Sequence, residues 1–107
     1  MRRLRYLDAA RPDLRAIAWY IARESRDDAV ARRFIGRIRA KCRSLAAAPG
    51  MLGRPRTELL PDLRSVTVGN YVIFFRYSAT TVDIVNIIEG HRDIDALFRR
   101  TSLQRLS

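Results

Sequence analysis

The segment at residues 69–90, GNYVIFFRYSATTVDIVNIIEG, contains two strand-like runs that are apolar at consecutive positions. Alternation divides the first run into two faces, with Tyr71, Ile73, Phe75 and Tyr77 on one and Val72 and Phe74 on the other. The second run divides into Val82, Ile84 and Ile88 on one face and Val85 and Ile87 on the other. Two neighbouring strands that are apolar on both faces need a cover on each side.

Turn residues connect these runs into a meander. Gly69 and Asn70 follow the run LRSVTV, and glycine at the first central position favours a two-residue type II′ hairpin. The segment SATT at 78–81 predicts a second reversal. The sequence therefore predicts three antiparallel strands in succession.

Two amphipathic helices are predicted upstream. The first runs from Arg11 to about Glu24, with Pro12 in its first turn and apolar residues at helical spacing. That stripe consists of Leu14, Ile17, Ala18 and Ile21. The segment SRDD at 25–28 indicates a break, and Asp27 and Asp28 suit the start of the next helix.

The second helix is predicted to run to about Ala48 and to stop at Pro49–Gly50. One face carries Ala31, Phe34, Ile38, Cys42 and Leu45, and the opposite face carries Arg32, Arg39 and Arg43. Cys42 lies on the apolar stripe, so we interpret it as a small core residue and not as a nucleophile. The single cysteine excludes an internal disulfide and is compatible with a reducing cytoplasm.

The remaining segments complete an α+β fold. Residues 3–7 predict a short N-terminal strand, and the Pro- and Gly-rich residues 49–63 predict a loop. Residues 91–100 predict a short C-terminal helix, capped by Asp93 and docked through Ile94, Leu97 and Phe98. We therefore expect one domain over residues 1–107. An N-terminal strand is followed by an antiparallel helix hairpin packed on one face of an antiparallel sheet, which ends in the three-strand meander.

The sheet face opposite the helices is the open question in this fold. The C-terminal helix is too short to cover it, which predicts an apolar groove or interface rimmed by Arg64 and Arg76. The alternative is that residues 1–7 and the C-terminal tail fold over this face. Trp19 projects off the apolar stripe of its helix, and it either packs at the helix edge or contacts a partner.

The charge balance points to an acidic partner or a polyanion. Lys and Arg number 21 against 11 Asp and Glu, a net charge of +10, and Lys41 is the only lysine. Such a field attracts nucleic acid or an acidic protein, although arginine preference also follows from a GC-rich genome. No apolar run approaches the roughly 20 residues of a membrane helix, so no membrane partner is expected.

The sequence contains few groups for catalysis. One histidine and one cysteine cannot supply a metal-ligand set, and no phosphate-binding glycine loop is present, so no metal or cofactor is expected. Arg64, Arg76, His91, Arg92 and Asp93 are grouped around the predicted strand ends. Arginines and a histidine could cleave a phosphodiester without metal, with His91 as acid or base. Equally, Arg92 and Asp93 could form an ion pair that anchors the last helix.

Four segments in order resemble the RelE/ParE superfamily of type II toxins. They are DLRAIAWYIARES, FIGRIRAKCRSLAAAPGMLGRPR, LRSVTVGNYVIFFRY and VDIVNIIEGHRDIDALF, and the resemblance extends over residues 4–98. It implies a cytoplasmic bacterial toxin in a hetero-oligomeric complex with an antitoxin of the ParD-like ribbon-helix-helix type. The acidic C-terminal segment of that antitoxin would cover the apolar groove. The residues expected to contact it are Trp19, Arg64, Val72, Phe74 and Arg76.

The resemblance favours the ParE (plasmid stabilisation) branch over the RelE branch. RelE-like nucleases often place an arginine after the aromatic that opens the central strand, where this chain has Val72, and no tyrosine follows Tyr77. ParE-like toxins poison DNA gyrase by binding, which implies no catalytic residues and makes Arg92, Arg99 and Arg100 candidate target contacts. The alternative is a ribosome-dependent mRNA endoribonuclease using Arg64, Arg76 and His91. A third hypothesis is a non-toxic basic nucleic-acid-binding module, which predicts salt-dependent binding.

Overall fold

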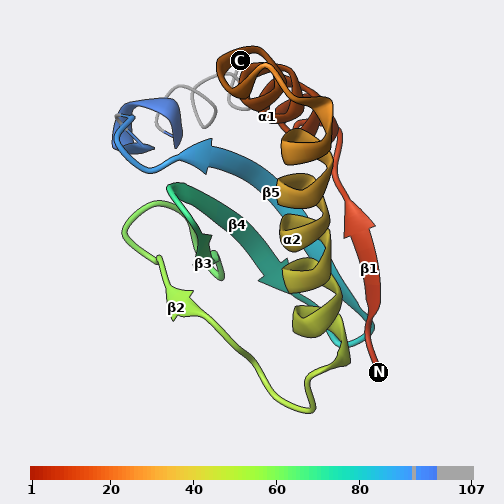
Figure 1. Cartoon of the computed structure of the whole chain (residues 1–107). Helices are drawn as coiled ribbons and strands as arrows, with labels where there is room; N and C mark the ends of the chain where they lie inside the picture. The colour runs from red at the N-terminus through yellow and green to blue at the C-terminus, as the bar shows by residue number, and fades with distance from the viewer. Residues whose placement is uncertain (93, 99–107) are drawn as a thin grey trace.

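The structure is a computed structural model that describes residues 1–92 and 94–98. Its elements follow the chain in this order: β1 (Arg3–Tyr6), α1 (Ala10–Ser25), α2 (Asp28–Ala47), β2 (Arg54–Pro55), β3 (Arg64–Val68), β4 (Tyr71–Tyr77) and β5 (Thr81–Glu89). One five-stranded sheet has the strand order β1-β5-β4-β3-β2, with the helices against one face (Figure 1). The predicted α+β fold and meander are confirmed.

The sheet is mixed, which corrects the prediction that it is antiparallel throughout. β1 pairs in parallel with β5, and the ladder continues from Leu7 N–H to the Ile84 carbonyl at 3.0 Å. At the paired positions Arg5 and Asp83, the guanidinium Nε lies 2.8 Å from the carboxylate. A parallel pair needs no hairpin. The sequence therefore contains no turn motif that would predict the contact between β1 and β5.

The break between the helices forms as expected. Arg26 adopts a left-handed conformation with φ 57°, and the Asp27 side chain caps α2 by accepting the Ala29 N–H at 2.9 Å. Both apolar stripes then face the sheet, with Ile17 of α1 and Ile38 and Cys42 of α2 buried in the main core. Cys42 is fully buried, which confirms its interpretation as a core residue.

The two strand reversals also form. Gly69 has φ 57°, whereas the φ of Asn70 is not positive. This combination fits the type II′ turn predicted between β3 and β4. Within the predicted loop 49–63, Arg54–Pro55 forms the short edge strand β2, an element that was not predicted. Proline is tolerated there because an edge strand leaves backbone donors unpaired.

A β-bulge in β5 corrects the predicted faces of that strand. Phe74 pairs with Asn86 and Phe75 with Ile84, so Val85 is an extra residue between them. The extra residue shifts the alternation by one position. As a result Ile87 joins Val82 and Ile84 on the helix side, while Ile88 joins Val85 on the opposite side.

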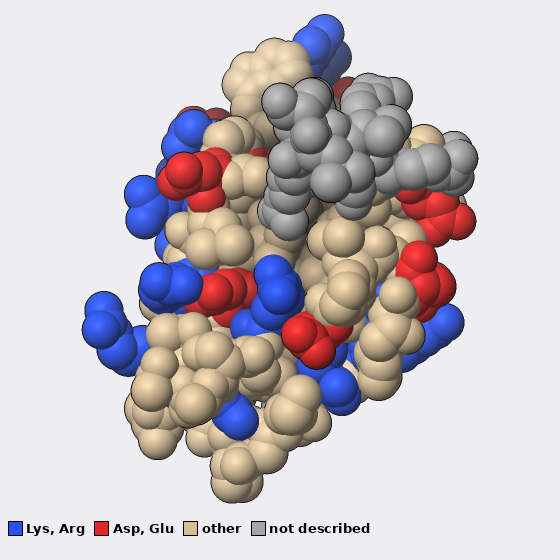
Figure 2. Space-filling model, turned by 180° about the vertical axis from the view of Figure 1, so that it is seen from behind, with Lys and Arg blue, Asp and Glu red and all other residues tan. Residues whose placement is uncertain are grey.

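The sheet face opposite the helices is covered by the chain itself, which corrects the expectation of an exposed apolar surface. Leu63, Phe74, Val85, Ile88 and Phe98 form a second buried cluster, and residues packed around it include Leu7, Leu59, Leu60, Ile94 and Leu97. Of the alternative, that residues 1–7 and the C-terminal tail fold over this face, Leu7 takes part in the cover, and the tail beyond residue 98 lies outside the described residues. The loop residues 59–63 supply a further part of the cover. Figure 2 shows the molecule from this side.

The C-terminal helical turn contributes the largest side chain of that cover, which corrects the expectation that this helix is too short to cover the face. Residues 94–98 are helical, and Phe98 lies 4.9 Å from Phe74 between ring centroids in an edge-to-face contact. Ile94 and Leu97 pack beside it, so the predicted docking residues are confirmed. The capping role predicted for Asp93 lies outside the described residues.

Candidate partner-binding groove

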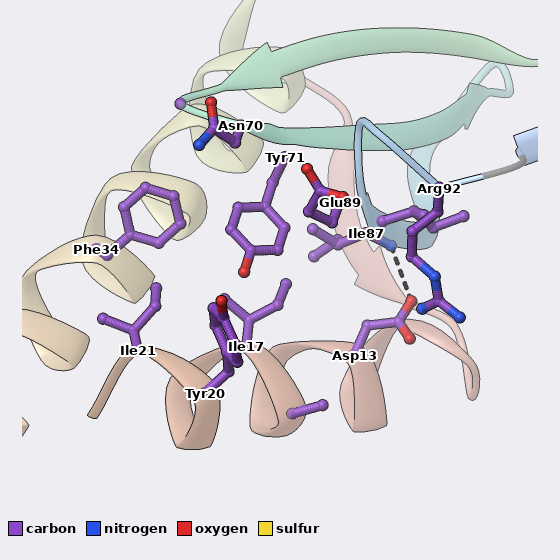
Figure 3. A pocket seen from close by; sticks show the side chains of 13 residues that line it. Asp13, Ile17, Tyr20, Ile21, Phe34, Asn70, Tyr71, Ile87, Glu89 and Arg92 are labelled. Carbon is purple, nitrogen blue, oxygen red and sulfur yellow. Dashed lines mark hydrogen bonds between the residues drawn. The ribbon is translucent and has the colours of Figure 1, made fainter. Parts of the chain in front are cut away.

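An open groove of about 710 Å³ lies where the helix hairpin meets the β3–β4 turn and the end of β5. Side chains from α1, α2, β4 and β5 surround it (Figure 3). The lining residues are Asp13, Ala16, Ile17, Tyr20, Ile21, Phe34, Gly69, Asn70, Tyr71, Ile87, Ile88, Glu89 and Arg92.

The walls of this groove are mainly apolar and are held in place by core packing. Ile17 and Ile21 lie one turn apart on α1, and Ile17 is 6% exposed. Across the groove, the rings of Phe34 and Tyr71 lie 5.5 Å apart between centroids. Since these side chains are also part of the main core or packed against it, the groove exists before any partner binds.

The lack of a side chain at Gly69 allows the β3–β4 turn to pack closely against Phe34. Its positive φ allows the tight turn before β4, and a Cβ at this position would lie 3.1 Å from Phe34 Cε1. A larger residue would therefore both strain the turn and press on the aromatic wall of the groove.

Asp13 connects the groove to the sheet. Its Oδ2 accepts the backbone N–H of Ile87 at 2.8 Å (Figure 3). It also accepts the side-chain amide of Asn86 at 3.4 Å. Burial raises the pKa of the Asp13 carboxyl, and these hydrogen bonds and the charge of Arg92 oppose the rise only in part. The carboxylate thus satisfies a backbone donor beyond the point where β1 ends.

Polar and charged side chains also line the groove. Burial raises the pKa of Tyr71, and the neighbouring Tyr20 and Glu89 add to this rise. Arg92 is the one cation among the described lining residues, and it lies beside Asp13 (Figure 3). An apolar segment with a carboxylate directed toward Arg92 would match this pattern of groups.

The three residues of the nuclease hypothesis do not share a site. Arg76 pairs with Asp83 at one end of the β4–β5 ladder, whereas His91 follows Glu89 at the other end. Asp83 and Glu89 are six positions apart along β5, which is about 20 Å at the usual rise. His91 is highly exposed, with 86% of its side chain accessible, and its backbone N–H bonds the Glu89 carboxylate.

Arg64 is engaged within the chain. Its Nε donates to the Leu52 carbonyl at 2.8 Å and its Nη2 donates to the Gly53 carbonyl at 2.9 Å. The side chain therefore fastens the loop before β2 onto β3. Arg76 is exposed on β4, at the end of the strand remote from the groove.

The other residues predicted to contact an antitoxin lie in three different environments. Trp19 is 62% exposed on α1, with the Arg23 guanidinium 5.1 Å from its ring centroid. Val72 is partly buried beside the second cluster, and Phe74 is fully buried within it. Phe74 can touch a partner only if the cover formed by Phe98 moves.

Of the residues predicted to contact the target, only Arg92 is described, and it lines the groove. Arg99 and Arg100 lie outside the described residues. No group of three or more His, Cys, Asp or Glu residues within residues 1–92 and 94–98 could hold a metal ion. Across the same residues, no helix is both long and apolar enough to cross a membrane.

Sequence reasoning missed Asp13, Tyr20 and Glu89 as parts of a site. For Asp13 a signal was present, because it precedes Ile17 and Ile21 at spacings of four and eight on the apolar stripe. A carboxylate on a buried stripe needs a partner, so its position alone pointed to a hydrogen-bonded role.

Comparison with known proteins agrees with this architecture. The family described as "ParE toxin of type II toxin-antitoxin system, parDE" matches residues 4–94. A solved structure titled "Chromosomal ParDE TA system from P. aeruginosa" has a similar fold, with a TM-score of 0.70 and 24% identity over 83% of this chain and 96% of that chain. No curated protein matches the sequence. With the family match covering most of its length, the chain belongs to the ParE toxins of type II toxin–antitoxin systems.

Proposed function

We propose that this ParE-type toxin poisons DNA gyrase by binding and is neutralised by an antitoxin segment seated in the groove. The observation that carries the proposal is a preformed apolar groove on a chain of net charge +10 that belongs to the ParE family. The separation of Arg76 from His91 supports action by binding, since a nuclease would need these groups together.

The antitoxin segment is expected to combine apolar and acidic residues. Its apolar side chains would fill the space between Ile21, Phe34 and Tyr71, and a carboxylate would pair with Arg92. A ParD-like ribbon-helix-helix protein with an acidic C-terminal segment has this chemistry. Contacts by Trp19 and Arg76 would require that the segment continue beyond the groove.

Gyrase poisoning is tested directly with the purified toxin, gyrase and supercoiled plasmid. We expect inhibition of supercoiling and accumulation of cleaved DNA, reversed by the antitoxin encoded beside the toxin gene. In cells, expression should induce DNA damage signals while messenger RNA stays intact. Codon-specific cleavage of ribosome-bound messages would contradict the proposal and favour the RelE-like alternative.

Substitution of exposed aromatic residues on α1 tests whether the antitoxin binds in the groove. Tyr20 is 53% exposed and lines the groove, so Tyr20→Ala should weaken antitoxin binding about tenfold or more without unfolding the chain. Met51 is 56% exposed and does not line it, which makes Met51→Ala a matched control. Equal effects of the two substitutions would place the antitoxin elsewhere. Trp19→Ala tests whether the interface continues across α1.

The C-terminal arginines are tested by truncation after Phe98. This change removes Arg99 and Arg100 and keeps Phe98, whose ring covers Phe74. We expect antitoxin affinity to stay nearly unchanged while toxicity falls. A truncated chain that kills cells as well as the full chain would show that these arginines do not contact the target.

A further inference from the structure

The outer side of α2 carries two rows of exposed basic side chains. Successive residues on a helix are 100° apart, which places two sets of cations on opposite flanks of the outward face. One row is Arg32, Arg39 and Arg43, and the other is Arg33, Arg37 and Lys41, all of them exposed. Asp28, in the first turn, is the only acidic residue of the helix.

Between the two rows, the outward surface of α2 carries small, exposed residues. Gly36 and Ala40 lie on it and are exposed, and nothing lies within 4 Å of the position that a Cβ on Gly36 would take. The opposite side of the helix is buried in the core through Ile38, Cys42 and Leu45. A partner can therefore approach the backbone of α2 closely while the basic residues reach around it on both flanks.

These cations are not neutralised by the rest of the described chain. The ion pairs within residues 1–92 and 94–98 join Arg5 to Asp83 and Arg56 to Glu58, and neither involves α2. Arg37 and Arg39 lie over the rings of Phe34 and Tyr6, at 5.4 and 5.6 Å from the centroids. These contacts orient two of the guanidinium groups without removing their charge.

We propose that this face of α2 binds the phosphate backbone of duplex DNA, with one row of cations on each strand flanking a groove. Arg32 and Arg43 are about 16 Å apart along the helix axis, and Arg33 and Lys41 are about 12 Å apart. Duplex DNA carries phosphates at regular intervals along each strand, one per about 3.4 Å of axis, so each row is long enough to reach more than one phosphate. The inference concerns the toxin's own contact with DNA and does not depend on gyrase being the target.

The composition of the face favours duplex DNA over other anionic partners. Large exposed hydrophobic side chains in the described structure are Met1, Trp19, Tyr20, Met51 and Leu52, and none lies on α2. A protein interface would need aromatic or aliphatic anchors, and single-stranded nucleic acid would need aromatic platforms for its bases. Double-stranded RNA has a deep, narrow major groove that side chains cannot read, so it suits a helix in the groove less well than duplex DNA does.

The test is fluorescence anisotropy of a labelled 24-base-pair duplex titrated with the full chain at several salt concentrations. Arg32→Gln/Arg43→Gln removes two cations from one row, and Arg33→Gln/Lys41→Gln removes two from the other. Neither variant touches the residues stacked on rings, and glutamine preserves helix propensity. The control Arg3→Gln/Arg54→Gln removes two exposed cations from β1 and β2.

Each α2 variant should bind about tenfold more weakly at low salt and reduce the slope of log K against log salt by about 2. The control should change this slope little. The proposal is overturned if the α2 variants behave like the control, if a single strand or an RNA duplex binds as tightly, or if the wild-type chain does not bind. The anisotropy assay contains no gyrase. A negative result in it would therefore leave the proposal of gyrase poisoning, which the supercoiling assay tests, as it stands.

Discussion

At the residue scale, substitution of Asp13 tests a hydrogen bond between a side chain of α1 and the backbone of β5. Asp13→Ala leaves the Ile87 N–H without its acceptor, so we expect a loss of about 1–3 kcal/mol in unfolding free energy. Asp13→Asn keeps a carbonyl oxygen that can accept this bond, and it should cost less. Urea unfolding of the three proteins at neutral pH measures both changes. Equal losses in the two variants would show that the hydrogen bond is unimportant.

The same carboxylate predicts a pH dependence. Its pKa is raised in the folded state, so the folded chain holds the proton more tightly than the unfolded chain. The stability contributed by Asp13 is therefore greatest below its unfolded pKa and declines as pH rises through the raised value. Relative to Asp13→Asn, the wild type should lose stability across this range in urea unfolding. A constant difference between the two proteins would contradict the shift.

Gly53 is a second residue with a defined physical constraint. Its φ is +82°, and a Cβ there would lie 2.7 Å from Phe75 Cζ and 2.9 Å from the Ser65 carbonyl. We expect Gly53→Ala to cost about 1–3 kcal/mol in thermal or chemical unfolding. Gly50 has open space around it and no positive φ, so Gly50→Ala is the control and should be neutral or slightly stabilising. Similar effects at both positions would contradict this explanation.

At the scale of elements, the helical turn at 94–98 determines whether the second sheet face stays covered. Phe98 is 4% exposed and packs on Phe74, so Phe98→Ala should cost about 3 kcal/mol and expose apolar surface. Urea unfolding measures the first effect and binding of a hydrophobic dye the second. Phe98→Leu keeps an apolar side chain and should retain most of the stability. An alanine variant as stable as wild type would show that the turn contributes little.

At the scale of the whole molecule, the net charge of +10 should control how fast an acidic antitoxin segment associates. Electrostatic steering raises association rates by about 10- to 1,000-fold and falls steeply with ionic strength. We therefore expect added salt to slow association about tenfold or more while dissociation changes little, as stopped-flow measurements with a synthetic peptide would show. A neutral peptide of the same length is the control. Association that is insensitive to salt would mean that short-range contacts in the groove dominate.

Local signals in the sequence were sufficient for the helices, the meander and the family. The i, i+4 stripes, the Asp27 cap and the Gly69–Asn70 turn each act within a few residues, so periodicity and turn chemistry indicate them directly. Burial of Cys42 and docking of Phe98 followed from the same spacing. The net charge, and with it the expectation of an anionic partner, depends on composition alone.

Only the tertiary structure decided which surfaces stay open. The parallel pairing of β1 with β5, the bulge at Val85 and the covering of Phe74 all depend on contacts between distant segments. Strand alternation could not reveal the bulge, because alternation assumes that no extra residue is present. One extra residue moves every later side chain of the strand to the opposite face of the sheet. The groove likewise exists only where α1, α2, β4 and β5 meet. The sequence by itself determined the elements and the charge of this protein, and the fold determined which side chains a partner can reach, since accessibility depends on what the whole chain covers.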